Sequence, residues 1–429
     1  MSTPTSLLDE LQWRGLVYDA SEGLREHLEA GPVTLYIGFD PTADSLHVGS
    51  LLQLMQLARL QRAGHRPIGL VGGGTGMIGD PSGKSLERQL LTREQVQKNI
   101  QGLRAQVARF LDFDAESNPA LLLDNAEWLE PVSILEFLRD VGKHFTVNYM
   151  VAKESVKRRM ESDEGISYTE FSYLLLQAYD FLVLRDRYGC SLQMGASDQW
   201  GNITAGTELI RKLRRTKAYG LVSPLVTTSS GVKFGKTEAG AVWLDPRRTS
   251  PYRFYQFWLN TSDDDVVRYL KFFTWLGREE IDELAARHAE APQQRQAQRR
   301  LAAEVTAMVH GDEALERAQV SSEVLFGGGA LGELAADELL EIFDAVPSSE
   351  LAHARIDEGL TAIDLFADAG LAKSKGEARR LVRDGGAYVN NERVAGEQEA
   401  IGVDRFIDGR VLVLRKGRKK YHLVHLEGA

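Results

Sequence analysis

The chain of 429 residues is predicted to be an α/β protein, with a helical region and a small α+β module after its first half. Up to about residue 225, short apolar runs alternate with amphipathic helical patterns, which is typical of a parallel sheet wrapped by helices on both faces. From 251 to 325 the pattern is almost wholly helical, and two hairpin patterns follow after residue 360. We therefore expect a Rossmann-like parallel-sheet domain, then an α-helical domain, then a small α+β domain.

Composition narrows the possible functions. The net charge is −10, so the chain as a whole repels nucleic acid, and any RNA must bind at a local basic patch. A single cysteine, Cys190, allows neither an internal disulfide nor a cysteine-based metal cluster, and it fits a reducing cytoplasm. The start of the chain is polar, and no apolar run approaches the roughly 20 residues of a membrane span. We expect a cytoplasmic protein with no membrane contact and no bound metal.

The first half is expected to form a sheet domain at 1–225, with a helical insertion at about 130–165. Its strands are expected at 35–39, 67–71, 121–123 and 191–194. Its helices are expected at 6–14, 23–30, 47–64, 92–110, 131–140, 153–160 and 168–188. Because ligands bind beyond the carboxyl ends of parallel strands, the functional residues should come directly after the strands.

The stretch 35–50 has the pattern of a strand, a turn at Asp40 and the start of a helix. This order puts His47 and Gly49 in the first turn of the helix, where backbone N–H groups are unpaired and the helix dipole favours an anion. His47 would add a donor beside a phosphate, and Gly49 has no side chain to keep a flat ring away. The alternative is an ordinary strand-to-helix connection whose histidine is incidental.

The glycine run 74–79 matches G-x-G-x-x-G, but its surroundings argue against a dinucleotide site. Such a site needs a helix that opens at once and an acidic residue about 20 positions on, after a second strand. Here 80–83 interrupts the helix, and a phosphate loop would need glycine where Ile78 stands. The remaining interpretation is a flexible loop, in which Asp80 receives an ammonium group and Lys84 and Arg88 either reach a phosphate or are only solvated.

The helix expected at 168–188 carries Tyr173, Gln177 and Asp180 on one face, at positions i, i+4 and i+7. A tyrosine, an amide and a carboxylate on an otherwise apolar face are typical of a pocket wall. The alternative is the edge of a core helix whose polar groups are satisfied.

Two later segments could reach a nucleotide. At the end of the strand at 191–194, Gln193 and Gln199 offer amides, and Asp198 could accept from both ribose hydroxyls. In the glycine-rich run 233–237, Lys233 and Lys236 could close on a polyphosphate as charge moves to the leaving group. The alternative for this second segment is a basic surface loop.

The last part of the chain reverses the charge of the rest. Residues 371–429 hold 13 Lys and Arg against 8 Asp and Glu, a net charge of +5, which is typical of an RNA-binding module. We place this module at 360–429, after an α-helical domain at 226–345 and a linker at 346–359. The basic residues expected to contact RNA are Lys375, Arg379, Arg383, Arg415, Lys416, Arg418, Lys419 and Lys420.

Taken in order, these segments resemble one family. The run 38–50 is similar to the His-Ile-Gly-His signature of class I aminoacyl-tRNA synthetases, with the flank of their tyrosine-specific branch. The fourth signature position is Ser50, whose hydroxyl reaches less far than an imidazole. The runs 72–84, 198–202 and 233–237 are similar to the same branch, and the tail resembles a small RNA-binding domain shared with a ribosomal small-subunit protein.

The resemblance implies a bacterial-type enzyme that activates tyrosine with ATP and Mg²⁺, transfers it to tRNA(Tyr), forms a homodimer near Tyr168 and has no permanently bound cofactor. It also implies that the α-helical domain binds the tRNA anticodon. The implied catalytic residues are His47, Lys233 and Lys236, with Lys84 as a weaker candidate. The residues implied to bind tyrosine are Tyr36, Asp80, Tyr173, Gln177, Asp180, Gln193 and Gln199. Those implied to bind ATP are Gly38, Asp40, Thr42, His47, Gly49, Ser50, Gly195, Asp198, Lys233 and Lys236.

Two other functional classes stay open. A nucleotidyl transferase outside translation would keep His47 and the lysine loop but would need no basic tail. A pure RNA-binding protein would keep the tail but would need no buried pair such as Tyr36 and Asp180.

Overall fold

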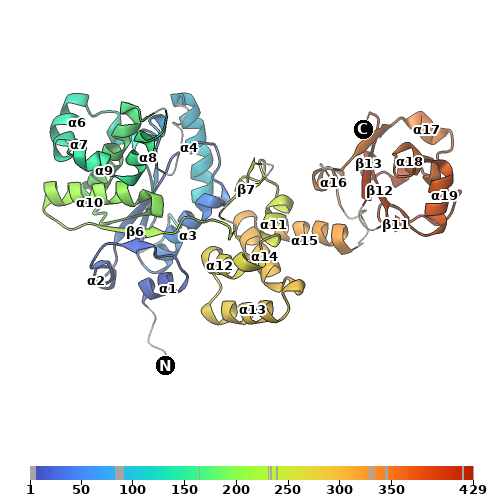
Figure 1. Ribbon diagram of the computed structural model, residues 1–429, viewed down its shortest axis with the longest axis horizontal. Coiled ribbons are helices and arrows are strands. Elements are labelled where there is room, and N and C mark those ends of the chain that lie inside the picture. The colour runs from blue at the N-terminus through green and yellow to red at the C-terminus, as the bar shows by residue number, and fades with distance from the viewer. Residues whose placement is uncertain are drawn as a thin grey trace. The chain divides into compact units, whose positions relative to one another are not determined.

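The computed structural model describes residues 6–82, 91–163, 165–229, 231, 234–237, 240–327, 331, 334–343, 346–417 and 420–428 (Figure 1). Contacts between residues divide the chain into two compact units. The first comprises 1–250 and 257–305, and the second comprises 251–256 and 306–429.

The first unit is built on a six-stranded sheet with the order β1-β6-β5-β2-β3-β4. Neighbouring strands are parallel except for β1 and β6. The strands are β1 (Asp19–Ala20), β2 (Thr34–Phe39), β3 (Arg66–Val71), β4 (Leu121–Asp124), β5 (Leu192–Ala196) and β6 (Tyr219–Ser223). The four predicted strands are confirmed. The sequence does not predict β1 or β6. Strand β1 has only two residues, too few to show an alternation of apolar and polar side chains, and the short β6 includes Gly220, a residue type that is rare in strands.

The order of the strands creates a crevice in this sheet. Strand β2 leads to β3 through α3 (Val48–Arg62), and β5 leads to β6 through α10 (Trp200–Arg214), in opposite directions along the sheet. Because such crossovers are right-handed, α3 and α10 cover opposite faces. The direction changes between the neighbouring strands β2 and β5, and a ligand site is expected beyond their carboxyl ends.

The remaining helices up to residue 327 agree with the predicted helical segments, except two short helices at 126–129 and 147–151 that lie outside the expected ranges. They are α1 (Leu7–Trp13), α2 (Leu24–Glu29), α4 (Arg93–Val107), α5 (Ala126–Leu129), α6 (Ile134–Asp140), α7 (Val147–Val151), α8 (Glu154–Met160), α9 (Tyr168–Tyr188), α11 (Pro251–Leu259), α12 (Asp263–Phe273), α13 (Arg278–Glu290), α14 (Gln296–His310) and α15 (Asp312–Gly327). Of the helices that the structure describes, none is long and apolar enough to cross a membrane.

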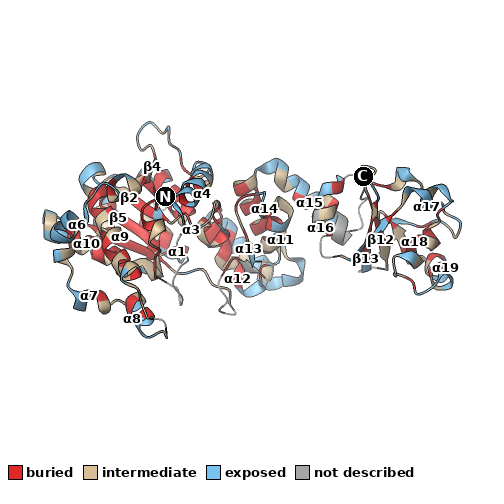
Figure 2. Ribbon diagram, turned by 90° about the horizontal axis from the view of Figure 1, so that it is seen from above, coloured by how far each residue is buried: buried red, intermediate tan, exposed pale blue. Residues whose placement is uncertain are grey.

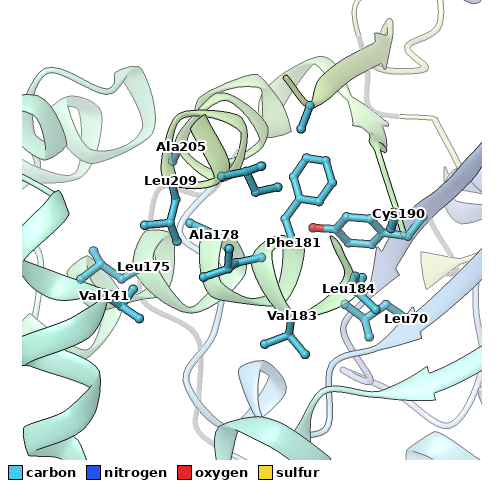
Figure 3. Close-up of a cluster of buried hydrophobic side chains, with 14 of the residues drawn as sticks. Leu70, Val141, Leu175, Ala178, Phe181, Val183, Leu184, Cys190, Ala205 and Leu209 are labelled. Carbon is cyan, nitrogen blue, oxygen red and sulfur yellow. The ribbon is translucent and has the colours of Figure 1, made fainter. Parts of the chain in front are cut away.

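The core beside the crevice is formed by α9, α10 and the sheet (Figure 3). Phe181 and Leu184 of α9 are fully buried against α10 and β3. Helix α10 approaches closely because residue 206 is glycine, where an added Cβ would lie 2.9 Å from a ring carbon of Phe181. Figure 2 shows the sheet and the inner faces of α3 and α9 as buried, whereas the outer faces of α4 and α6 are exposed.

The second unit contains a five-stranded sheet with the order β11-β10-β12-β13-β9. Its elements are α16 (Ala336–Ile342), β9 (Ser348–Leu351), α17 (His353–Asp357), α18 (Ala362–Asp368), α19 (Lys375–Arg383), β10 (Ala387–Val389), β11 (Glu392–Arg393), β12 (Val411–Lys416) and β13 (Lys420–Leu426). One buried cluster joins the sheet to α18 and α19, and a second joins it to α16. The first of the two predicted hairpins is confirmed, with Asn390 and Asn391, both of positive φ, forming the turn that connects β10 to β11.

The segment expected to be a linker, 346–359, is folded in the structure. Strand β9 pairs in parallel with β13 at the edge of the sheet, and α17 follows it. The proline and serines at 347–349 resemble a loop in sequence, but parallel pairing with a distant strand depends on tertiary contacts that no local pattern carries.

The insertion is fixed to α9 by a buried ion pair, and this pair generates a stability prediction. Arg159 and Glu170 form two hydrogen bonds of 2.7 and 2.9 Å, with side chains only 1% and 4% exposed. Replacing Arg159 by Ala should lower the free energy of unfolding by about 3–5 kcal/mol, because it leaves a buried carboxylate unpaired. The matched control is Arg158→Ala, which removes an exposed ion pair with Glu154 and should cost at most about 1 kcal/mol. Equal losses of stability in urea unfolding would contradict the prediction.

Candidate functional site

A cavity of about 280 Å³ lies beyond the carboxyl ends of β2 and β5. It brings together residues from four predicted segments that are far apart in the sequence. The predicted residues that line it are Tyr36, Gly38, Asp40, Thr42, His47, Gly49, Ser50, Asp80, Tyr173, Gln177, Asp180, Gln193, Gly195 and Gln199. The crevice that the strand order creates is therefore the same place that the polar residues mark.

One end of the cavity carries a buried carboxylate beside a hydroxyl group. Asp180 is 2% exposed and accepts hydrogen bonds from Asn125 Nδ2 at 2.9 Å and Trp128 Nε1 at 2.7 Å. Burial raises the pKa of Asp180 to about 7, although these two hydrogen bonds act in the opposite direction. Tyr36 is 1% exposed, and its hydroxyl has no hydrogen-bond partner within the described residues. This end can therefore receive a ligand hydroxyl that donates to Asp180 and meets Tyr36.

The middle of the cavity is a network of amides and carboxylates. Gln199 donates to Asp80 Oδ2 at 2.7 Å and accepts from Gln177 at 3.1 Å, while Asn202 donates to Gln177 at 2.9 Å. Asp80 also accepts from the backbone N–H of Ser82, which fixes its carboxylate. A fixed anionic group with amides around it suits a ligand ammonium group.

Asp40, expected to face ATP, has both carboxylate oxygens hydrogen-bonded in this structure. Tyr173 Oη donates to Oδ2 at 3.0 Å, and Thr75 Oγ1 donates to Oδ1 at 3.0 Å. Residue 72 must be glycine to allow this, because an added Cβ would lie 2.3 Å from Asp40 Oδ1. Tyr173 thus connects the network on α9 with the loop that follows β2.

His47 is the N-cap residue of α3, one position before the first turn in which it was expected. Its Nδ1 accepts from the backbone N–H of Gly49 at 2.9 Å, so the neutral ring carries its proton on Nε2. The histidine therefore adds a donor to the N-terminus of α3, which already favours an anion. An added Cβ at Gly49 would lie 2.6 Å from the ring, so glycine is required for this geometry.

The segment that carries Lys236 forms the first strand of a short hairpin, and this hairpin lies beside the start of α3. Lys236 lies in β7 (Lys236–Thr237), which pairs with β8 (Gly240–Ala241), while Lys84 and Lys233 lie outside the described residues. An added Cβ at Gly235 would lie 2.5 Å from Val48 Cγ2, and the φ of Gly235 is +80°. The backbone of the predicted polyphosphate loop is thus in contact with the helix that carries His47.

Several residues of the site escape sequence reasoning. Asn125 donates to Asp180 and to Thr75, and accepts from the backbone of Gly74. Asn125 directly follows β4, so the rule that functional residues follow strands could have found it, whereas Trp128 of the four-residue α5 carries no such signal. Asp198, in the turn before α10, is not among the described residues that line the cavity.

In the second unit, the predicted basic residues differ in how freely they face solvent. Arg379 and Lys420 are exposed, and Arg415 lies 3.8 Å over the ring of Tyr388. The others described form ion pairs, namely Lys375 with Asp364, Arg383 with Glu397 and Lys416 with Glu377. Arg418 and Lys419 lie outside the described residues.

Comparisons with known proteins agree along the chain. Residues 28–327 match the family model of class I tRNA synthetases (W and Y), and residues 338–424 match the C-terminal domain of tyrosine–tRNA ligases. The chain is 58% identical to a tyrosine–tRNA ligase of Roseiflexus castenholzii, over 98% of this chain and all of that protein. It is 53% identical to one of Geobacillus stearothermophilus, over 97% of this chain and 99% of that protein.

A solved structure is also similar. A C-terminally truncated mitochondrial tyrosyl-tRNA synthetase of Aspergillus nidulans matches with a TM-score of 0.69 and 31% identity. The match covers 76% of this chain and 95% of that one.

The raised pKa of Asp180 predicts a pH-dependent stability. Because the folded-state pKa of about 7 exceeds the ordinary aspartate pKa of 3.8, the protonated carboxyl contributes stability that is complete below about pH 4 and is lost as the pH rises through about 7. Asp180→Asn cannot ionise, so the stability of the wild type relative to this variant should fall by roughly 4 kcal/mol from pH 4 to pH 8. Urea unfolding at several pH values measures this difference. The exposed Asp186→Asn on the same helix is the control, and a flat difference for Asp180→Asn would refute the assigned pKa.

Proposed function

Because the chain belongs to the tyrosine–tRNA ligases of the class I tRNA synthetase family, we propose that the cavity beyond β2 and β5 holds tyrosine and ATP while they react. The enzyme is a ligase that attaches tyrosine to tRNA, and its family uses ATP. The observation that carries the placement is the pair of Asp180 and Tyr36, a buried acceptor beside a hydroxyl without a partner among the described residues. A phenolic hydroxyl is the group that fits both.

In this proposal the tyrosine side chain points toward Asp180, and its ammonium group meets Asp80 and the amide network. Its carboxylate then lies nearer to the start of α3, where it attacks the α-phosphate of ATP and pyrophosphate leaves. No protein nucleophile takes part, so catalysis consists of positioning and of stabilising charge on the phosphates. His47 Nε2–H and the helix N-terminus supply donors, and Lys236, Lys233 and Lys84 are proposed to supply positive charge. Mg²⁺ is proposed to accompany ATP as part of the substrate.

The predicted basic residues of the second unit, here called its basic face, are proposed to bind tRNA. Arg379 and Lys420 are its most available cations, because they are exposed and have no carboxylate within ion-pair distance among the described residues. Lys375, Arg383 and Lys416 keep their charge but would have to share it with their acidic partners. The α-helical segment after the lysine loop is proposed to bind the anticodon.

A homodimer is also proposed, on the basis of exposed apolar side chains on the insertion and on α9. Ile134 and Leu135 of α6 are 71% and 76% exposed, and Val147 of α7 and Tyr168 at the start of α9 are 63% and 72% exposed. Phe137 of α6 packs against Tyr179 of α9, but no residue of this helix is fully buried, and Ile134 and Leu135 remain exposed. Such a patch is typical of an interface with a second copy. We propose the cytoplasm as the location of the enzyme, on the evidence of its single cysteine.

The pair of Tyr36 and Asp180, which is proposed to bind the phenolic hydroxyl of tyrosine, gives a prediction about specificity. Tyr36→Phe should lower the ratio of kcat/KM for tyrosine over phenylalanine by roughly tenfold, because one hydrogen bond to the hydroxyl is lost. Asp180→Asn should largely abolish tyrosine activation, because its NH2 group, a donor, would replace one of the two carboxylate oxygens that accept from Asn125 and Trp128. The kcat/KM of both variants is measured by pyrophosphate exchange into ATP with tyrosine and with phenylalanine. Ratios equal to that of the wild type would reject this assignment of the cavity.

The tail gives a second prediction. A chain that ends at Gly327, before the clusters of the C-terminal sheet begin at Leu331, should keep pyrophosphate exchange close to that of the full chain. It should lose most tRNA charging, and the plot of log affinity against log salt should flatten by about 0.7–0.9 for each phosphate contact removed. The double variant Arg379→Ala/Lys420→Ala tests the same face without truncation. Equal charging and equal slopes would show that the tail does not bind tRNA.

The exposed apolar patch gives a third prediction. The wild type should sediment with the mass of two chains, and Leu135→Asp should shift it toward one chain, because a charge would be buried in the interface. The control is Leu225→Asp, an exposed leucine outside the insertion. A monomeric wild type, or dissociation by both substitutions alike, would count against this patch as the dimer interface.

A further inference from the structure

His47 is exposed, and its Nδ1 accepts a hydrogen bond from the backbone N–H of Gly49. Its Nε2–H must nevertheless point at the phosphates when they react, and a misplacement of about 1 Å can cost roughly 10²-fold in rate. A second contact on the ring would fix this direction. The ring of Trp243 supplies one, because it meets the His47 ring edge to face with centroids 6.1 Å apart.

The register of the backbone dictates this contact. The segment after the lysine hairpin runs antiparallel to the signature loop, with Val48 N donating to Val242 O at 2.9 Å and Leu244 N donating to Leu46 O at 2.8 Å. His47 and Trp243 are therefore directly opposite each other, as a non-hydrogen-bonded pair. In such pairs the Cα atoms are closest and the two side chains lie on the same face.

Trp243 is itself held in place. The Arg248 guanidinium lies 4.7 Å over its ring and forms an ion pair with Asp44, three residues before His47. The backbone N–H of Asp245 donates to Ser45 Oγ at 3.2 Å. The segment 242–248 is thus fastened to the loop 44–48 at four points, two by backbone and two by side chains.

We propose that Trp243, supported by Arg248, is a positioning residue for His47 in adenylate formation. Trp243 lies in the segment that directly follows the lysine hairpin. Its contact with His47 therefore also holds the end of that hairpin beside the start of α3. The inference rests on the proposed function, in which His47 Nε2–H acts on the phosphates. It adds a residue that the signature sequences do not include.

The test is a double-mutant cycle in single-turnover adenylate formation. Trp243→Ala should slow the step roughly 10- to 100-fold, with the KM for tyrosine within about twofold of the wild type. Trp243→Phe, which keeps an aromatic edge, should restore most of the rate. In a His47→Ala background, Trp243→Ala should cost less than about twofold, because the group that it positions is gone.

Matched arginine variants keep the test independent of folding. Arg248→Ala should slow the step several-fold and should also lose its effect in the His47→Ala background. Arg247→Ala, from the same turn but ion-paired with Asp245 rather than with Asp44 among the described residues, should not slow the step. An equal loss from Trp243→Ala with and without His47, or no loss at all, would overturn the inference. A wild type that exchanges pyrophosphate with no amino acid would instead overturn the proposed function.

Discussion

The carboxylate of Asp180 is buried at the end of a cavity, and the surrounding elements are arranged to hold it there. Strand β2 brings Tyr36, α9 brings Asp180 itself, and the turn after β4 brings Asn125 and Trp128 as donors. A buried carboxyl is costly when it ionises, which is why its pKa rises to about 7. The two fixed donors reduce that cost only in part, and a substrate hydroxyl would supply what is missing.

The other end of the site depends on backbone pairing. The signature loop and the segment after the lysine hairpin are about 200 residues apart in sequence, yet an isolated antiparallel β-bridge joins them at the start of α3. Gly235 allows the hairpin to lie against Val48, and Gly49 leaves room for the ring of His47, since a Cβ at either position would overlap that neighbour. The proposed function assigns the phenol to Asp180 and the phosphates to His47, and both residues line the same cavity as Asp80 and Gln199.

Sequence patterns were sufficient for the parts of the site that follow local rules. The helical spacing of residues in α9 predicted that Tyr173, Gln177 and Asp180 share one face, and the strand-to-helix pattern at 35–50 pointed to His47. Asn125 and Trp128 escaped, because they lie in a loop and a four-residue helix whose role depends on where β4 places them. The strand β9 escaped for a similar reason, since its pairing with β13 spans about 75 residues. Charge counting located the basic tail but could not show that Lys375 and Arg383 are paired with carboxylates.

The most direct test of the buried acceptor is the number of protons released when tyrosine binds. Titration calorimetry at pH 6 in buffers of different ionisation enthalpy measures this number. The carboxyl of Asp180, with a pKa near 7 in the empty site, is then mostly protonated and must ionise to accept the phenolic hydrogen, so the account predicts release of close to one proton per site. Phenylalanine should release none, and tyrosine should release none at pH 8. No proton release with tyrosine at pH 6, or equal release with phenylalanine, would contradict the account.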